Sequence, residues 1–541
     1  MLWRAIAGQW RCVSAASALG AMHQTGEALV PVLIGVIIDE AVATGDAGAL
    51  ARLVAVLIGL FVVLSLSFRF SLRLGERGSE RASHAIRMEL TARVLHSGGG
   101  AENGRLSGEL ASIATGDAKR VGSVNLALPI AFAAVVGLVV GAVALLRVSV
   151  PLGLLILVVA PLMLVLAHLL GKPLERRSEA EQDRAAQASG IAADLVSGLR
   201  ALKGIGAEST AASRYHLTSQ GSLVAAVRAA RAQSLLEGSV LTLTGLFLAL
   251  IALVGGKLAV QGDITVGQLV AAVGLAQFLL WPLTIFSWVN GLFAQGRASA
   301  KRVTEVLSAP YAVPPAAGSL PSDVRGHLRL SGVSSDSLRS LDLEVRPGEL
   351  LGVVAPDPAD AAALLRLLGR EVDPTAGSVE LDGVCVSTVD VSSLRGSVVV
   401  AAHDADLFEG TVASNVVGDV DGALDASALT LPLETPVSER GRSLSGGQRQ
   451  RVALARALAL APPVLVLHDP STAVDAVTEV SLAAGIREMR RDRTTIVVAS
   501  SPALLGAADR VVLLSDGRFV ASGTHSDLVR DHETYRAAVL S

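Results

Sequence analysis

The chain has 541 residues, of which 51% are hydrophobic and 18% are charged. Its mean hydropathy of +0.53 is too apolar for a soluble enzyme of this size and indicates membrane-spanning segments. The net charge of −3 gives no electrostatic reason to expect a nucleic-acid partner. Two cysteines, Cys12 and Cys385, cannot build a disulfide framework. The length predicts at least two domains.

Apolar segments in the first half of the chain are each long enough, at roughly 20 residues, to cross a bilayer as a helix. Six such segments lie at residues 13–38, 50–72, 126–146, 152–170, 235–260 and 266–293. Arg4 and Arg11 precede the first of them, as in a signal peptide. That segment is too long for the core of a cleavable leader, and further spans follow. The sequence therefore predicts a multi-pass membrane domain.

The charges of the connecting segments predict the orientation of this domain. Residues 73–123 and 172–231 are long and rich in arginine and lysine, whereas the opposite turns at 39–49, 147–151 and 261–265 are short and carry few cations. Because cationic segments stay in the cytoplasm, we expect both termini there, on a cytoplasmic (inner or plasma) membrane. Helical spacing of apolar residues in the two long segments predicts that the membrane helices continue into the cytoplasm as a stalk.

Two ionisable residues, His23 and Glu27, lie four apart on one face of the first predicted span. Such a pair is costly at membrane depth unless it faces a cavity or another helix. Two interpretations carry equal weight: a contact with substrate or a proton, and a polar contact between helices. Gln277 and Asn290 in the last span raise the same question on weaker grounds.

The composition changes after the last span. Residues 309–322 are rich in Pro, Ala, Gly and Ser, which marks a linker. Short apolar runs alternate with helical patterns behind it, as in an α/β domain. We therefore expect a transmembrane domain at 1–308, a linker at 309–325 and a nucleotide-binding domain at 326–541.

The most specific motif is Leu444, Ser445, Gly446, Gly447 and Gln448, which opens an apolar-periodic helix. Two glycines after a hydroxyl residue offer N–H groups at the positive end of a helix dipole, which makes an anion site. A glycine-rich helix cap that binds nothing is the plain alternative. With its continuation Arg-Gln-Arg, the motif resembles the signature of the ATP-binding-cassette (ABC) proteins. In that family the signature closes over the γ-phosphate held by the partner's P-loop, so the resemblance implies half of a nucleotide site.

Other segments resemble the type I exporter branch of the ABC family. Asp475, in Thr-Ala-Val-Asp, resembles the D-loop residue that faces the partner's site. Glu439, Arg440 and Gly441 resemble the X-loop, which touches the coupling helices. The resemblance implies an all-α six-helix transmembrane domain followed by an α/β P-loop NTPase-like domain.

The loop that would hold this chain's own nucleotide departs from the family's pattern. Residues 355–363 lie in the strand-loop-helix context of a P-loop, but Ala361 stands where a lysine is required. Two prolines in this loop remove N–H donors, and its two aspartates repel phosphate.

The other positions of the family's own-site machinery are also changed. His468 stands in place of the magnesium-binding aspartate and is a poor ligand for that hard ion. Asp469 replaces the general-base glutamate and is one methylene shorter. His403 replaces the Q-loop glutamine, and Ser500 replaces the switch histidine. We expect no intact catalytic residue and no metal site in the chain's own site.

The changes fall on the residues that would touch the chain's own nucleotide, and the motifs that face a partner are kept. Random loss of function would change both groups of residues alike. We therefore expect a subunit of a heterodimeric exporter that is hydrolytically inactive alone. Its partner would be a second half-transporter with intact Walker A and B motifs, which would hold most of the ATP and Mg²⁺. The cargo would be a small hydrophobic or peptide-like substrate.

Two other functions stay open at this point. One is an importer built on the exporter fold, with siderophore-like cargo, which the direction of flux would distinguish. The other is a catalytically silent membrane scaffold or sensor, which nucleotide-insensitive behaviour would favour. A homodimeric pump is disfavoured because both of its sites would be dead.

Overall fold

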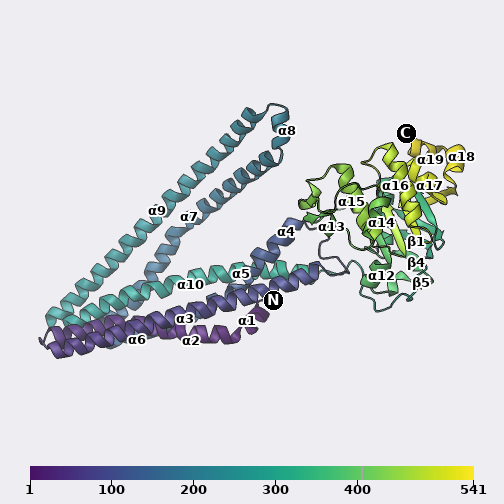
Figure 1. Cartoon of the computed structure of the whole chain (residues 1–541). Helices are drawn as coiled ribbons and strands as arrows, with labels where there is room; N and C mark the ends of the chain where they lie inside the picture. The colour runs from purple at the N-terminus through teal and green to yellow at the C-terminus, as the bar shows by residue number, and fades with distance from the viewer. Residues whose placement is uncertain (404–405, 541) are drawn as a thin grey trace. The chain divides into compact units, whose positions relative to one another are not determined.

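The computed structural model describes residues 1–403 and 406–540, apart from the side chains of residues 164, 167, 168, 173, 175, 283 and 287. The chain divides into two compact units, coloured by residue number in Figure 1. The helical unit comprises Met1–Leu90 and Ser107–Glu305, and the second unit comprises Thr91–Leu106 and Val306–Ser541. Thr91–Leu106 therefore packs with the second unit, although its neighbours in sequence belong to the first.

The helical unit combines six long helices with several short ones. Its elements are α1 (Leu2–Ala7), α2 (Trp10–Ile37), the π-helix η1 (Ile38–Val42), α3 (Ala47–Val94), α4 (Ser107–Ser112), the π-helix η2 (Ile113–Asp117), α5 (Ala118–Gly122), α6 (Val124–Val148), α7 (Val150–Ser197), α8 (Leu199–Gly204), α9 (Glu208–Gln261) and α10 (Val266–Leu307).

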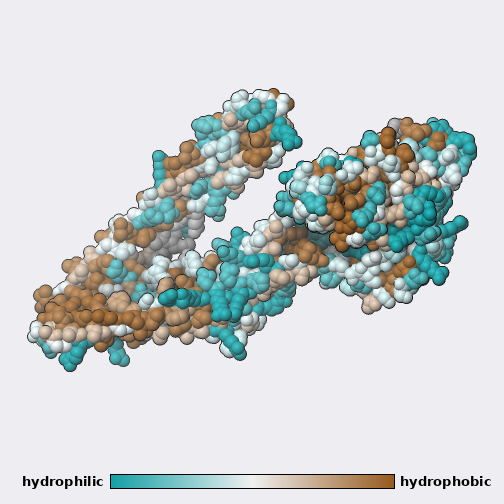
Figure 2. All heavy atoms as spheres, in the orientation of Figure 1, coloured by the Kyte–Doolittle hydropathy of each residue, from teal (hydrophilic) through white to brown (hydrophobic). Residues whose placement is uncertain are grey.

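Six long helices contain the six predicted apolar segments: α2, α3, α6, α7, α9 and α10. Four helical stretches in the described part are long and apolar enough to cross a membrane, namely Ala47–Val94, Ser107–Val148, Glu208–Gln261 and Val266–Leu307. A helix of 54 residues such as α9 is about 80 Å long, well over the roughly 30 Å of hydrocarbon. Figure 2 shows hydrophobic side chains gathered over one end of these helices and more hydrophilic ones elsewhere.

One apolar core joins α2, α6, α7, α9 and α10. Small residues on α2 and α10 let large side chains of the other helices fill the space between them. The buried members are Ala28, Leu145, Leu152, Ile156, Ala160, Phe247, Ile251, Ile264, Ala272, Leu275, Ala276 and Leu279.

The ends of α2 and α10 meet at two glycines. A Cβ added at Gly267 would overlap the carbonyl oxygen of Gly35 and the carboxylate of Asp39. Asp39 accepts hydrogen bonds from the Gly267 amide at 2.9 Å and from the Thr265 hydroxyl. The carboxylate therefore caps the first turn of α10, where free N–H groups favour negative charge.

We predict that Gly267→Ala destabilises the helical unit by about 1–3 kcal/mol, because the new methyl group must push α2 away from α10. Thermal unfolding in nanodiscs measures this loss. The control is Gly256→Ala on α9, where an added Cβ meets no atom within 4 Å. Equal melting temperatures for both variants would contradict the close approach.

The described residues of the second unit form three sheets. The four-stranded antiparallel sheet has the order β2-β1-β4-β5, the six-stranded sheet has the order β12-β11-β3-β10-β9-β6, and β7 pairs with β8. The strands are β1 (Leu328–Ser335), β2 (Leu338–Val345), β3 (Leu350–Val354), β4 (Ala376–Leu381), β5 (Val384–Cys385), β6 (Val398–Ala401), β7 (Gly410–Thr411), β8 (Pro436–Val437), β9 (Val464–His468), β10 (Thr494–Val498), β11 (Arg510–Ser515) and β12 (Arg518–Gly523).

The helices of this unit lie between the strands in sequence. They are α11 (Pro358–Leu368), η3 (Val386–Thr388), α12 (Val391–Ser397), α13 (Val412–Asn415), α14 (Val420–Ala426), η4 (Glu439–Gly441), α15 (Gly446–Ala459), α16 (Ala476–Met489), α17 (Pro502–Ala507), α18 (His525–Asp531) and α19 (Glu533–Leu540).

The six-stranded sheet is buried on both faces. Along β9, Val464 and Val466 pack in a core with α11 and the antiparallel sheet, whereas Leu465 and Leu467 pack in a core with α15 and α16. This alternation follows from the two-residue period of a strand, and a sheet buried on both faces explains the continuous apolar run. β6, β9, β10, β3 and β11 are parallel. The predicted α/β domain is confirmed.

Candidate functional site

The signature motif forms the start of α15. Ser445 is the N-cap: its hydroxyl accepts the Gln448 amide at 3.2 Å, and its own amide donates to Gln448 Oε1 at 2.9 Å. This reciprocal capping box leaves the amides of Gly446 and Gly447 without a hydrogen-bond partner among the described residues. Two free donors at the positive end of a helix make an anion site.

A short loop after β9 packs against this helix start. Gln450 on α15 donates to the Asp469 carbonyl at 2.7 Å and to the Thr472 hydroxyl at 3.0 Å, and its Oε1 accepts the Ala473 amide at 2.9 Å. An added Cβ at Gly447 would press on the Ala473 carbonyl, so only glycine fits there. Gln450 therefore holds the signature and the D-loop as one surface.

Asp475 and Leu444 differ in exposure: Asp475 is an ionised helix cap, and Leu444 is a buried anchor. Asp475 caps α16 and accepts bonds from the Thr478 amide at 3.0 Å and the Thr478 hydroxyl at 2.8 Å. These bonds hold the pKa of Asp475 below its usual range, so it stays ionised. Leu444 is buried in the core under α15, so its side chain anchors the motif.

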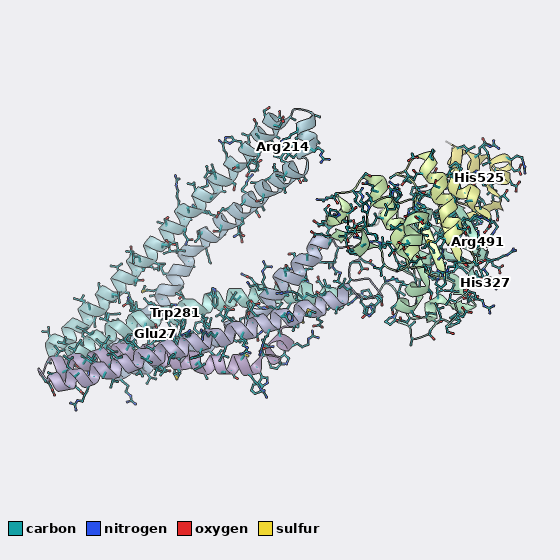
Figure 3. The ribbon with its side chains drawn as sticks, viewed as in Figure 1. Glu27, Arg214, Trp281, His327, Arg491 and His525 are labelled. Carbon is teal, nitrogen blue, oxygen red and sulfur yellow. The ribbon has the colours of Figure 1, made fainter. Side chains whose placement is uncertain are left out.

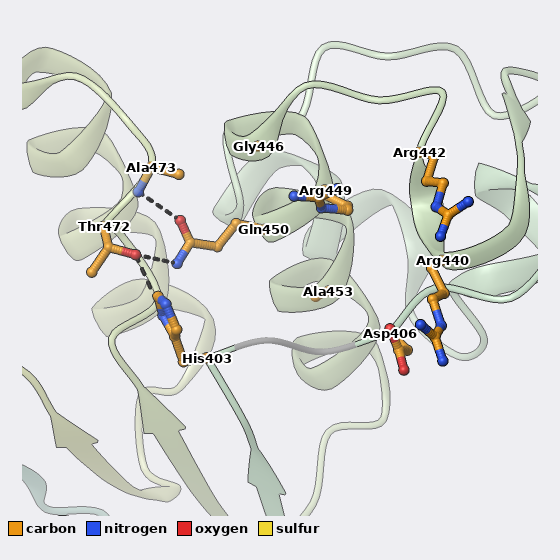
Figure 4. A pocket seen from close by; sticks show the side chains of 10 residues that line it. All are labelled: His403, Asp406, Arg440, Arg442, Gly446, Arg449, Gln450, Ala453, Thr472 and Ala473. Atoms are coloured by element: carbon orange, nitrogen blue, oxygen red, sulfur yellow. Dashed lines mark hydrogen bonds between the residues drawn. The ribbon is translucent and has the colours of Figure 1, made fainter. Parts of the chain in front are cut away.

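A basic pocket of about 410 Å³ opens beside the signature helix (Figure 4). The predicted X-loop residues Glu439, Arg440 and Gly441 form the turn η4, in which Arg440 and Gly441 both have positive φ. Arg440 lines the pocket, and an added Cβ at Gly441 would clash with the stem of Arg449. The full lining is His403, Asp406, Arg440, Arg442, Gly446, Arg449, Gln450, Ala453, Thr472 and Ala473.

The helix after β3 begins very differently from α15. Asp357 is the N-cap of α11, and its carboxylate accepts the Ala359 amide at 2.8 Å. The amides of Asp360 and Ala361 bond to the Asp357 carbonyl, and Pro358 has no N–H. The Asp360 side chain is 2% exposed and accepts the Gly517 amide at 2.9 Å. The first turn of α11 therefore offers no free N–H.

A pocket of about 350 Å³ lies at the end of β3 and brings together four of the predicted own-site residues. They are Ala361, His468, Asp469 and Ser500. His468 Nε2 lies 3.6 Å from Asp469 Oδ2, and the Asp469 backbone has a φ of 43°. The lining contains neither lysine nor arginine.

The C-terminal helix α19 closes one side of this pocket through Ala538. Tyr535 anchors α19 because its side chain is fully buried in a cluster with Val354 and Leu505. Its hydroxyl shares a 2.8 Å hydrogen bond with His525 Nδ1, and burial raises the pKa of Tyr535 to about 12. The phenol is therefore neutral throughout the physiological range.

His403 is not part of that pocket lining. It lines the basic pocket instead, with Nδ1 3.4 Å from the Thr472 hydroxyl and its ring centroid 5.9 Å from that of His468. Within the described residues, no group of three or more His, Cys, Asp or Glu side chains is arranged to hold a metal ion.

Three of the four polar residues predicted along the membrane path meet in one cavity of the helical unit. His23, Glu27 and Gln277 line a space of about 740 Å³ between α2, α3 and α10, and Trp281 belongs to the same lining. Glu27 and Trp281 are labelled in Figure 3. Asn290, nine residues beyond Trp281 on α10, is exposed and does not line it.

Sequence reasoning used Arg449 and Gln450 only as the continuation of the signature motif, and it assigned no site role to them or to Arg442. The one available signal was their place in or next to the first turns of α15, where side chains flank the free amides. It also missed Ala538, because no local pattern connects the C-terminal helix with the end of β3.

Comparison with known proteins agrees with this geometry. Residues 15–283 match the family described as ABC transporter transmembrane region, and residues 338–472 match the family described as ABC transporter. A multidrug efflux ATP-binding/permease protein of Mycobacterium bovis is 31% identical over 535 residues, covering 94% of this chain and 44% of the relative. The chain thus spans less than half the length of that relative.

Two further proteins are similar over much of the chain. An ATP-dependent lipid A-core flippase of Chromobacterium violaceum is 30% identical over 406 residues, covering 71% of this chain and 69% of the relative. The solved structure of a bacterial Atm1-family ABC exporter with ATP bound has a TM-score of 0.74 at 23% identity, covering 99% of this chain and 98% of that one.

These findings define a membrane protein that carries a helical transmembrane region and an ABC ATPase domain on one polypeptide. The chain belongs to the ABC transporter family and has the type I exporter fold. It is a multi-pass membrane protein, as the sequence predicted.

We predict that Gln450→Leu loosens the D-loop, because the Ala473 amide loses its acceptor. Loss of one hydrogen bond of about 1.5 kcal/mol corresponds to roughly tenfold faster exchange, and hydrogen exchange of the segment around Ala473 measures it. The control is Gln220→Leu, whose side chain bonds to His216 one turn earlier on α9. Unchanged protection at Ala473 in Gln450→Leu would contradict the bridging role.

Proposed function

We propose that this chain is one half of a heterodimeric ABC exporter and that ATP is hydrolysed at the composite site completed by its signature. In this proposal the chain comprises a transmembrane domain of residues 1–308, a linker of 309–325 and a nucleotide-binding domain of 326–541. Both termini face the cytoplasm. Its partner is a second half-transporter with intact Walker A and B motifs, which holds most of the ATP and Mg²⁺.

The observation that carries the proposal is the contrast between two helix starts. α15 presents two glycine amides without hydrogen-bond partners among the described residues. α11 begins with a proline, and the next amides of its first turn donate hydrogen bonds to Asp357. A phosphate at α11 would displace a carboxylate from the helix dipole and meet a second, buried aspartate, Asp360. The residues of this pocket therefore do not fit a magnesium-bound triphosphate.

The side chains of that pocket support the same conclusion. Its lining holds no cation to offset phosphate charge, and imidazole such as His468 is a poor magnesium ligand. Phosphoryl transfer depends almost wholly on positioning and charge stabilisation. A site without a lysine or glycine amides, and with His468 where the family has its magnesium-binding aspartate, therefore contributes no hydrolysis.

The relatives' names favour export of apolar cargo. One is a multidrug efflux protein and another a lipid A-core flippase. A small hydrophobic or peptide-like substrate fits the apolar helices of this chain. The cavity that holds His23, Glu27 and Gln277 is the proposed segment of its path, and Asn290 lies further along α10.

We predict that the reconstituted heterodimer loses ATPase activity by about 10²-fold or more when Ser445→Arg is introduced, because a bulky cation replaces the small cap beside the free amides. Phosphate release from proteoliposomes measures the rate. The matched control is Ser500→Ala in the other pocket, which leaves the rate of the pair unchanged. Full activity of the Ser445→Arg pair would contradict the proposal, as would appreciable ATPase activity of this chain alone.

A further inference from the structure

The cavity between α2, α3 and α10 has the size of a small-molecule site. At about 740 Å³ it falls within the 300–1,000 Å³ typical of ligand pockets. Aromatic rings supply much of its wall, and one acidic side chain faces it. Those residues are Phe61, Phe68, Phe278, Trp281 and Glu27.

Glu27 keeps one carboxylate oxygen available. Its Oε2 accepts a 3.1 Å hydrogen bond from Gln24 and lies 3.6 Å from His23 Nε2. Its Oε1 has no hydrogen-bond partner among the described residues, and 47% of the side chain is exposed. Gln24 is 2% exposed, so it fixes the carboxylate from the buried side.

His23 does not offset the charge of Glu27 when the imidazole is neutral. Its Nδ1 lies 3.1 Å from the Leu64 carbonyl oxygen, and since a carbonyl only accepts, Nδ1 carries the proton. The neutral ring then presents the lone pair of Nε2 toward Glu27. The ring also packs on Phe68, with centroids 4.9 Å apart, which holds it in place.

The one other charged residue in the lining, Arg69, lies at the opposite end. His23 meets α3 at Leu64, and Arg69 is five residues further along, about 8 Å at 1.5 Å per residue. Glu27 lies one turn beyond His23 on α2, in the direction away from Arg69. This follows because its neighbour Gly26 packs against Leu60 and Leu64, on the earlier part of α3. The cavity therefore has an anionic end and a cationic end.

A carboxylate beside aromatic faces selects positive charge. Aromatic rings attract cations through their quadrupole, and an organic cation with apolar substituents loses little hydration on leaving water. An apolar anion of the same size meets the opposite charge effect at Glu27. We propose that this cavity binds hydrophobic organic cations, with Glu27 as the counter-ion and Phe61, Phe68, Phe278 and Trp281 as the apolar wall.

That such a cation is also cargo rests on the proposed transport function, but its binding does not. The test uses the full chain in nanodiscs, without nucleotide or partner, and two probes of equal shape and opposite charge: tetraphenylphosphonium and tetraphenylborate. Equilibrium dialysis against protein-free nanodiscs corrects for partition into lipid. We expect saturable binding of the phosphonium, weakened about tenfold or more by Glu27→Gln, and no such loss for the borate.

Two matched variants separate charge from structure. Arg69→Gln removes a charge at the other end of the same cavity and leaves phosphonium binding equal or tighter. Glu109→Gln removes an exposed carboxylate on α4, outside the cavity, and leaves it unchanged. Equal phosphonium affinity in Glu27→Gln and the parent chain would overturn the inference, as would equally tight saturable binding of tetraphenylborate by the parent chain. Neither result bears on the ATPase of the pair with Ser445→Arg, so the two proposals fail separately.

Discussion

The hydrogen bond from the Ala359 amide to the Asp357 carboxylate, at the start of α11, is the interaction on which the proposed function depends. A helix start holds phosphate by its free amides and its dipole, and here the protein's own anion has taken that place at 2.8 Å. Pro358 removes one donor, and the Asp357 carbonyl occupies two more. The same fold that cradles phosphate in other P-loop proteins is therefore internally saturated at this position.

The start of α15 differs from that of α11 because its glycine amides stay free while side-chain hydrogen bonds fix its geometry. The capping box at Ser445 satisfies the N3 amide and leaves the glycine amides free. Gln450 ties this turn to the loop after β9 with three hydrogen bonds. A preorganised surface with unsatisfied donors is useful only when an anion arrives from outside the chain. In the proposed heterodimer, the signature of this chain would therefore contact a nucleotide that the partner holds and hydrolyses.

The sequence predicted the fold well because its signals are local. Apolar runs of membrane length predicted the long helices, and the continuous apolar run of β9 fits a strand that is buried on both faces. The signature, the missing lysine at Ala361 and the substitutions at His468 and Asp469 were also readable, since each is a change of residue type within a recognisable frame. His403 was assigned to the nucleotide pocket, yet its side chain lines the basic pocket, because loop geometry decides where it points.

Other features depend on tertiary contacts that no local pattern encodes. Thr91–Leu106 packs with the second unit. Ala538 lies in the pocket at the end of β3, and Glu27 shares a cavity with aromatic rings from α3 and α10. Each of these contacts joins segments that are far apart in sequence. Helical spacing showed that His23 and Glu27 share a face, but only the packing of α3 and α10 shows that this face opens into a cavity.

The most direct test of the central claim is a calorimetric titration of the isolated chain in nanodiscs with Mg-ATP. We expect no saturable binding in the micromolar range, because Asp357 fills the phosphate position at the start of α11 and the isolated chain has no partner to present a nucleotide to its signature. Micromolar binding that is lost on Ala361→Glu, at the first turn of α11, would contradict it.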